Sequence, residues 1–177
     1  MYTIKARFER FSDWRLDSLI GAVGVYVIWD AKSKARPTYI GEGNVLKRLS
    51  DHVERDGRKF AHPWDGYIAL LVGSTRGVHK FEAKAIERLL LDIAEATDRY
   101  PAANSHPGSF ADVLGYCKNE TLRVAISGFD PLLPPRTARP MRGSKEVTVR
   151  RDRAKGIVVN HDWRWRRLRK AIGSSRE

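Results

Sequence analysis

Residues 24–29 read Gly-Val-Tyr-Val-Ile-Trp, and residues 38–41 read Thr-Tyr-Ile-Gly. Both stretches are rich in β-branched and aromatic residues and bounded by polar residues or glycine, so they predict two short strands. The basic segment 31–37 between them is short enough for a hairpin loop, which makes an antiparallel pair the expected arrangement. Residues 67–72 form an unbroken apolar run that is consistent with a third, buried strand.

Helical patterns surround these strands. A helix is predicted over residues 12–20, and a second is predicted after Asn44, a favourable N-cap residue. The longest pattern, residues 81–97, repeats its apolar residues at steps of four and stops before a proline. Weaker signals predict a helix over 110–116 and a strand over 122–126. The expected fold class is therefore α/β, with a small three-stranded antiparallel sheet flanked by helices.

Positive charge is concentrated at the C-terminal end of the chain. The 177 residues carry 33 Lys+Arg and 21 Asp+Glu, a formal net charge of +12. Residues 136–177 hold 14 basic and 4 acidic side chains, against 19 and 17 in residues 1–135. Prolines from position 131 to 140 break any regular element. The sequence thus predicts a nearly neutral domain, 1–135, and a basic C-terminal extension, 136–177, that suits a polyanionic partner.

Several classes of protein are disfavoured by composition. Cys117 is the only cysteine, so neither an intramolecular disulfide nor a cysteine-paired zinc site is available. No apolar run approaches the roughly 20 residues that span a bilayer, and residues 1–11 lack the apolar core of a signal peptide. A cytoplasmic protein in a reducing compartment, with no membrane partner, is expected, as a monomer or homodimer.

Two tripeptides carry a family resemblance. Gly-Val-Tyr at 24–26 and Tyr-Ile-Gly at 39–41 resemble the paired motif of the GIY-YIG endonuclease family. Arg48 and His52 follow at a spacing of four on the second predicted helix, so both project from one face. The resemblance extends over the motif core 24–104 and implies a compact GIY-YIG-like nuclease domain.

Two further elements follow in the family's order. Glu82 and Glu87 bracket apolar residues at the start of the long predicted helix, and Asn104 resembles the family's closing asparagine. The two glutamates are about 140° apart around a helix, so they do not both face one metal ion. Leu89 and its apolar neighbours follow Glu87 as they follow the family's metal-binding glutamate. Glu87 is therefore the expected ligand, with Glu82 as the alternative.

The residue types suit phosphodiester hydrolysis. A single carboxylate can hold one Mg²⁺ (or Mn²⁺) when water and substrate phosphate complete the coordination, and Glu87 is the candidate. The Arg48 guanidinium suits a developing phosphoryl charge. Tyr26 is a candidate general base if nearby positive charge lowers its pKa, and His52 is a candidate proton relay.

The resemblance adds roles for the tyrosines and the asparagine. It implies that Tyr26 activates the water while Tyr39 shapes the site and contacts phosphate. Asn104 is expected to form hydrogen bonds within the site and to orient the helix carrying Glu87. Glu42 departs from the family pattern, because some members carry Lys or Ser there, and the stretch from Glu87 to Asn104 is slightly long.

Each residue also has an ordinary structural explanation. Tyrosines in strands are commonly core residues, Arg48 and His52 fit a solvated helix face, and asparagine is common in turns. Their occurrence together and in order favours the nuclease interpretation.

The basic extension has two interpretations. Its arginines and lysines can bind phosphate and its tryptophans can stack on bases, or the tryptophans can dock the segment on the body while the cations remain solvated. A basic helix is predicted over 162–172. The candidate nucleic-acid-binding residues are Arg150, Arg151, Arg153, Lys155, Trp163, Arg164, Trp165, Arg166, Arg167, Arg169 and Lys170.

The sequence therefore predicts a Mg²⁺-dependent, single-metal DNA endonuclease whose target is open among single-stranded, duplex and branched DNA. A catalytically inactive nucleic-acid-binding module of the same fold is the alternative. An adaptor that recognises an acidic protein is a third hypothesis. Removal of the residues after Pro135 is expected to weaken DNA binding and to leave some cleavage.

Overall fold

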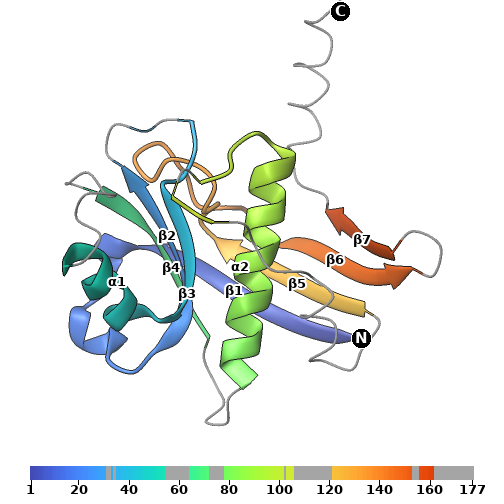
Figure 1. The fold of residues 1–177 in the computed structure, drawn as a ribbon, viewed down its shortest axis with the longest axis horizontal. Helices are drawn as coiled ribbons and strands as arrows, with labels where there is room; N and C mark the ends of the chain where they lie inside the picture. Colours follow the sequence, from blue (N-terminus) through green and yellow to red (C-terminus); the bar gives the residue numbers. More distant parts are fainter. Residues whose placement is uncertain are drawn as a thin grey trace, which may run out of the picture.

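The protein is an α/β structure built on one seven-stranded mixed sheet (Figure 1). The computed structural model describes residues 1–30, 33, 35–54, 64–71, 78–101, 103–105, 121–152 and 156–161. The sheet has the strand order β3-β2-β4-β1-β5-β6-β7. Its strands are β1 (Tyr2–Arg10), β2 (Val23–Asp30), β3 (Tyr39–Asn44), β4 (Trp64–Leu70), β5 (Thr121–Gly128), β6 (Lys145–Asp152) and β7 (Gly156–His161).

The predicted pairing of residues 24–29 with residues 38–41 is confirmed. β2 runs antiparallel to β3, with Tyr26 opposite Gly41, and on its other side antiparallel to β4. The predicted three-stranded sheet is nevertheless wrong in extent, because β1 continues the sheet beyond β4. β1 pairs antiparallel with β4 and in parallel with β5. Strand β5 itself covers the predicted strand 122–126.

Strands β1, β6 and β7 were not predicted from the sequence, and β1 has the clearest local pattern of the three. It alternates strictly, with Ile4, Ala6 and Phe8 buried and the residues between them exposed. This period-two pattern is typical of a strand with one face on the core. The charged residues at its outward positions are what make residues 1–11 unlike the apolar core of a signal peptide.

The described structure contains two α-helices. Helix α1 (Val45–Glu54) begins where predicted, and the Lys47 amide donates a 3.1 Å hydrogen bond to the Asn44 side-chain oxygen. Helix α2 (Val78–Ala96) is the predicted long helix, begun three residues earlier. The helix predicted over 12–20 is wrong. Two short 3₁₀ turns, Phe11–Asp13 and Leu16–Leu19, occupy that segment, and no side chain caps either.

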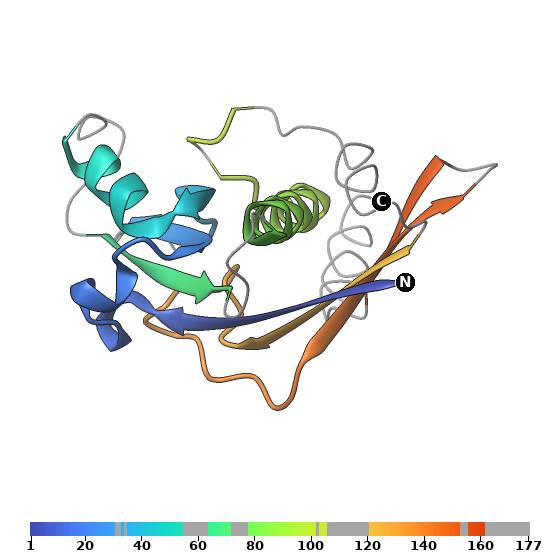
Figure 2. The same cartoon turned by 90° about the horizontal axis from the view of Figure 1, so that it is seen from below.

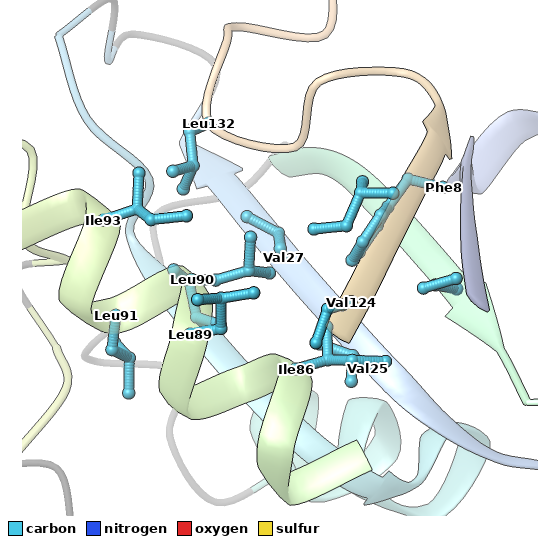
Figure 3. Packing of buried hydrophobic residues seen from close by; sticks show 14 of the residues in the cluster. Phe8, Val25, Val27, Ile86, Leu89, Leu90, Leu91, Ile93, Val124 and Leu132 are labelled. Carbon is cyan, nitrogen blue, oxygen red and sulfur yellow. The ribbon is translucent and has the colours of Figure 1, made fainter. Parts of the chain in front are cut away.

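Two hydrophobic clusters lie on opposite faces of β2. Successive strand residues point to opposite faces, so Val25 and Val27 join one cluster while Tyr26 and Ile28 join the other. Figure 3 shows α2 contributing leucines and isoleucines to the first cluster, opposite Val25, Val27 and Val124. Helix α2 lies against one face of the sheet (Figure 2). The second cluster is smaller and includes residues of α1 and of the 3₁₀ turns.

The sheet does not end at the expected domain boundary near Pro135. β6 pairs antiparallel with β5, and its Val147 and Val149 side chains are fully buried in the first cluster. Residues 129–144 lack helix and strand, as their prolines predict. This segment is anchored to the core, because the Tyr67 hydroxyl donates a 2.8 Å hydrogen bond to the Leu133 carbonyl. The first part of the basic extension therefore belongs to the same sheet as the body.

Other expectations fall outside the described residues. These are the helix predicted over 110–116 and the basic helix predicted over 162–172. Within the part of the chain that the structure describes, neither helix has the length and apolar character needed to cross a membrane.

Candidate active site

Tyr26 and His52 form a buried pair between β2 and α1. The Tyr26 hydroxyl oxygen lies 2.9 Å from His52 Nε2, and the two residues are 0% and 5% exposed. Burial raises the pKa of the Tyr26 hydroxyl far above its ordinary value, a negative charge on Tyr39 adds to the rise, and Arg48 opposes it. The positive charge of Arg48 does lower the Tyr26 pKa, as expected, but burial raises that pKa by more. Tyr26 is a neutral phenol at pH 7.

Tyr39 packs beside this pair from β3. Its ring stacks on Tyr26 with centroids 6.0 Å apart and meets the His52 ring edge-on at 4.8 Å. Tyr39 is half-buried, so it is partly open to solvent whereas the neighbouring Tyr26 is closed to it. Burial raises the pKa of Tyr39, while the charge of Arg48 and hydrogen bonds to Arg48 and Tyr26 oppose the rise.

Gly41 makes this aromatic cluster possible. A Cβ at Gly41 would lie 2.6 Å from Tyr39 Cε1 and closer still to the Tyr26 hydroxyl. Real Cβ atoms do not approach other atoms so closely, so a side chain here would displace both rings. The presence of glycine at position 41 is therefore explained by the space that the two tyrosine rings occupy. Gly24 has a different one, because a Cβ there would meet the backbone of Ala69 on β4.

Arg48 reaches the two tyrosine hydroxyls from α1. The side chain is exposed, and its Cγ passes 3.8 Å from the position of a Cβ on Gly43. Gly43 has a φ of +120°, a conformation that other residues rarely adopt. The charge of Tyr26 is the largest influence on Arg48 and raises its pKa further. The guanidinium thus joins the tyrosines on their solvent side.

The structure separates the two candidate glutamates of α2. Glu82 accepts a 2.7 Å hydrogen bond from the Tyr2 hydroxyl on β1. Glu87 is half-buried and interacts electrostatically with Tyr26, Tyr39 and Arg48. Of the two carboxylates, Glu87 is the one associated with the aromatic cluster.

The environment of Glu87 disfavours its charge. Burial is the main cause that raises its pKa to about 7, and the nearby Glu42 carboxylate raises it further. Lys84 and Arg48 oppose this rise. A bound cation would stabilise the ionised form of such a carboxylate more than that of a solvated one.

Asn104 is bound to the edge strand rather than to α2. Its side-chain oxygen accepts a 2.9 Å hydrogen bond from the Ile40 amide, and its side-chain nitrogen donates a 2.7 Å hydrogen bond to the Ile40 carbonyl. The Ala103 amide also donates to the Thr38 carbonyl at 3.1 Å. Asn104 therefore imitates a neighbouring strand and fixes β3 between Tyr39 and Gly41. The expected hydrogen bonding of Asn104 near the site is therefore to β3, and its predicted role of orienting the helix of Glu87 stays a prediction.

Glu42 is a site feature that the sequence interpretation noted only as a departure from the family pattern. Its Oε2 atom is buried and forms no hydrogen bond with any described residue. An unpaired buried carboxylate oxygen is costly, so this atom is consistent with a cation beside Glu87. Within the described ranges, no group of three or more His, Cys, Asp or Glu side chains could hold a metal ion. Magnesium is commonly bound by one or two carboxylates, with water and phosphate completing the shell.

Two of the candidate nucleic-acid-binding residues lie on a described strand. Arg150 and Arg151 are exposed on β6. The nine others lie outside the described residues: Arg153, Lys155, Trp163, Arg164, Trp165, Arg166, Arg167, Arg169 and Lys170.

Comparisons with protein-family models, with curated proteins and with solved structures found no match to this chain.

Proposed function

We propose that this protein is a metal-dependent DNA endonuclease of the GIY-YIG type. The observation that carries the proposal is the cluster formed by one phenol pair, one imidazole and one guanidinium at the β3 edge, with one carboxylate of α2 within electrostatic range of it. Four separate elements contribute these groups, which are Tyr26, Tyr39, Arg48, His52 and Glu87. Buried titratable groups with shifted pKa values and specific partners are typical of active sites.

Tyr26 is the general base, and His52 makes this role feasible. A phenol with a raised pKa accepts a proton only if it passes its own proton on. His52 Nε2, 2.9 Å away, is the acceptor in the tautomer that carries its proton on Nδ1. Because Tyr26 is closed to solvent, the proton of the attacking water reaches it through Tyr39, which is half-buried and hydrogen-bonded to it. The water oxygen bonds to phosphorus, the ester bond to the leaving oxygen breaks, and that oxygen takes a proton from solvent.

Arg48 stabilises the charge that develops on the phosphoryl group. Its exposed guanidinium adjoins the tyrosine hydroxyls. A phosphate bound to Arg48 would therefore lie beside the hydroxyls that carry the proton away from the attacking water. A planar guanidinium donates two parallel hydrogen bonds to phosphate oxygens, which fixes orientation as well as charge.

Glu87 would hold one Mg²⁺ or Mn²⁺ ion. When bound, such an ion supplies Lewis-acid neutralisation of the phosphoryl oxygens. The donor set fits this role, because the half-buried Glu87 carboxylate and the unpaired Glu42 oxygen both gain from positive charge. The net charge of +12 and the exposed Arg150 and Arg151 support DNA as the partner.

The experiment is a cleavage assay on labelled single-stranded, duplex and branched DNA, with Mg²⁺, Mn²⁺ or EDTA. Cutting that requires the metal, and that is lost in Glu87→Gln but kept in Glu95→Gln, supports the proposal. Glu95 is a matched control because it is an exposed glutamate on the same helix. Salt-dependent DNA binding without cutting under any condition would instead identify the inactive nucleic-acid-binding module.

A further inference from the structure

Glu42 lies on the face of β3 that is turned toward α2. Side chains alternate along a strand, so Glu42 shares a face with Ile40 and not with Tyr39 or Gly41. Ile40 is fully buried in the cluster that α2 supplies, and Val25, opposite Glu42 in the register, belongs to the same cluster. The Glu42 side chain therefore leaves the strand on the side from which α2 presents Glu87.

One oxygen of the partly buried Glu42 carboxylate is held there without a hydrogen bond to any described residue. Its Oε2 atom is buried and has no partner among the described residues. Glu87 on α2 is close enough for the two negative charges to repel. Two adjoining carboxylates, one with a buried and unpaired oxygen, are an arrangement that a divalent cation stabilises.

We infer that Glu42 is a second carboxylate for the cation at Glu87, so that the site is built from one strand residue and one helix residue. This inference rests on the proposed metal-dependent function. It assigns a role to the residue at which the chain departs from the family pattern. A carboxylate there adds negative charge to the ion site where some family members carry Lys or Ser.

Metal binding to the full chain tests this inference without any measurement of cleavage. Mn²⁺ is titrated into EDTA-stripped protein and free Mn²⁺ is measured by electron paramagnetic resonance, for the wild type, Glu42→Gln, Glu87→Gln and the control Glu95→Gln. We expect Glu42→Gln to weaken Mn²⁺ binding by about 10–100-fold, as loss of a group in or next to a coordination shell commonly does. Glu95→Gln is expected to bind as the wild type does.

The possible results are distinguishable. Wild-type affinity in Glu42→Gln overturns the role of Glu42, as it would if the two carboxylates merely shared a proton, and leaves the proposed function standing. Failure of the wild type to bind Mn²⁺ overturns the proposed metal site and this inference together. If Glu42→Gln does not fold, Glu42→Asp replaces it, because it keeps the charge and moves it back along the side chain. Weaker binding by Glu42→Asp supports the inference, and unchanged binding overturns it.

Discussion

The Tyr26 hydroxyl oxygen lies 2.9 Å from His52 Nε2, in a contact closed to solvent. It joins the middle of β2 to the last turn of α1, so one hydrogen bond serves both the packing of α1 and the proposed proton path. Buried polar groups that are fully paired in this way specify one arrangement, because each loses much of its stabilisation if the other moves.

Tyr26→Phe removes the buried hydroxyl that lies 2.9 Å from His52 Nε2. We expect the cleavage rate to fall by about 10²–10⁴-fold, the range for loss of a general base. The free energy of unfolding should fall by about 1–3 kcal/mol, the cost of losing one side of a buried hydrogen bond. Single-turnover cleavage and urea unfolding measure the two effects.

Tyr67→Phe is the matched control for this change. Tyr67 is also a buried tyrosine of the central strands, but its hydroxyl donates to the Leu133 carbonyl, away from the site. It should lose comparable stability and keep its cleavage rate. Equal loss of cleavage in both variants would mean that Tyr26 acts only through folding.

Gly41→Ala is expected to disturb the site through sterics alone. The added Cβ would lie 2.6 Å from Tyr39 Cε1 and nearer to the Tyr26 hydroxyl, so both rings must shift. Overpacking of this kind costs about 1–3 kcal/mol, and the cleavage rate should fall with it. Thermal unfolding and near-ultraviolet circular dichroism report the change. Gly143→Ala has open space around its Cβ but a φ of +79°, so it measures the backbone strain of a glycine substitution without a steric clash at the site, and it should keep its cleavage rate.

Asn104→Asp replaces the donor that faces the Ile40 carbonyl with a second oxygen. One hydrogen bond to β3 is lost and two oxygens face each other, so we expect a loss of about 1–3 kcal/mol. Hydrogen exchange at the Ile40 amide should quicken as the edge strand loosens. Asn44→Asp makes the same chemical change at the N-cap of α1, where aspartate is as good as asparagine. Stability should change little in that control.

The stability of the metal-free protein should depend on Glu87 near neutral pH. The pKa of Glu87 is about 7 in the folded chain against an ordinary 4.5, so between these values the folded state binds a proton that the unfolded state has lost. The free energy of unfolding therefore falls as pH rises from about 4.5 to about 7 and levels off above that range.

Glu87→Gln should remove this contribution. Between pH 4.5 and 7, the free energy of unfolding of the variant should rise relative to that of the wild type by about 1–3 kcal/mol, after allowance for solvent screening. Urea unfolding in EDTA at pH 4.5, 6 and 8 measures the difference. Asp92, whose pKa burial raises to about 6, contributes equally to both proteins and cancels. Parallel curves would show that the Glu87 pKa is ordinary.

Truncation separates the two parts of the basic extension. Deletion after Pro135 removes β6 and β7, which would expose the buried face of β5 to water. We now expect this truncated protein to unfold, in place of the residual cleavage predicted from sequence. Deletion of residues 162–177, which hold six Lys/Arg and two Asp/Glu, should keep the fold. It should also lower the salt dependence of DNA binding, measured by fluorescence anisotropy. An unchanged salt slope would place the DNA contacts elsewhere.

Local sequence patterns predicted those elements whose signals lie within a few residues. The aromatic and β-branched residues of β2, the N-cap of α1 at Asn44 and the four-residue spacing in α2 each determine a local conformation without distant partners. The helical spacing of apolar residues in segment 12–20 predicts a helix, but the segment forms only two short 3₁₀ turns. The domain boundary at Pro135 was placed by charge density, because the segment after it is rich in arginine. The alternating buried residues Val147 and Val149 of β6 lie within that basic segment.

By itself, the sequence determined the strand pair at residues 24–29 and 38–41, the two helices and the order of the candidate site residues. Only the tertiary structure decided that β1 and β6 extend the sheet, that Glu82 bonds to Tyr2 and that Asn104 holds the edge of β3. It also showed why Gly41 must lack a side chain, and that Glu42 Oε2 is buried without a hydrogen-bond partner among the described residues. The physical reason is one of range: strand and helix patterns repeat over two to four residues, whereas burial, pKa shifts and unpaired oxygens depend on segments that meet only in the folded chain.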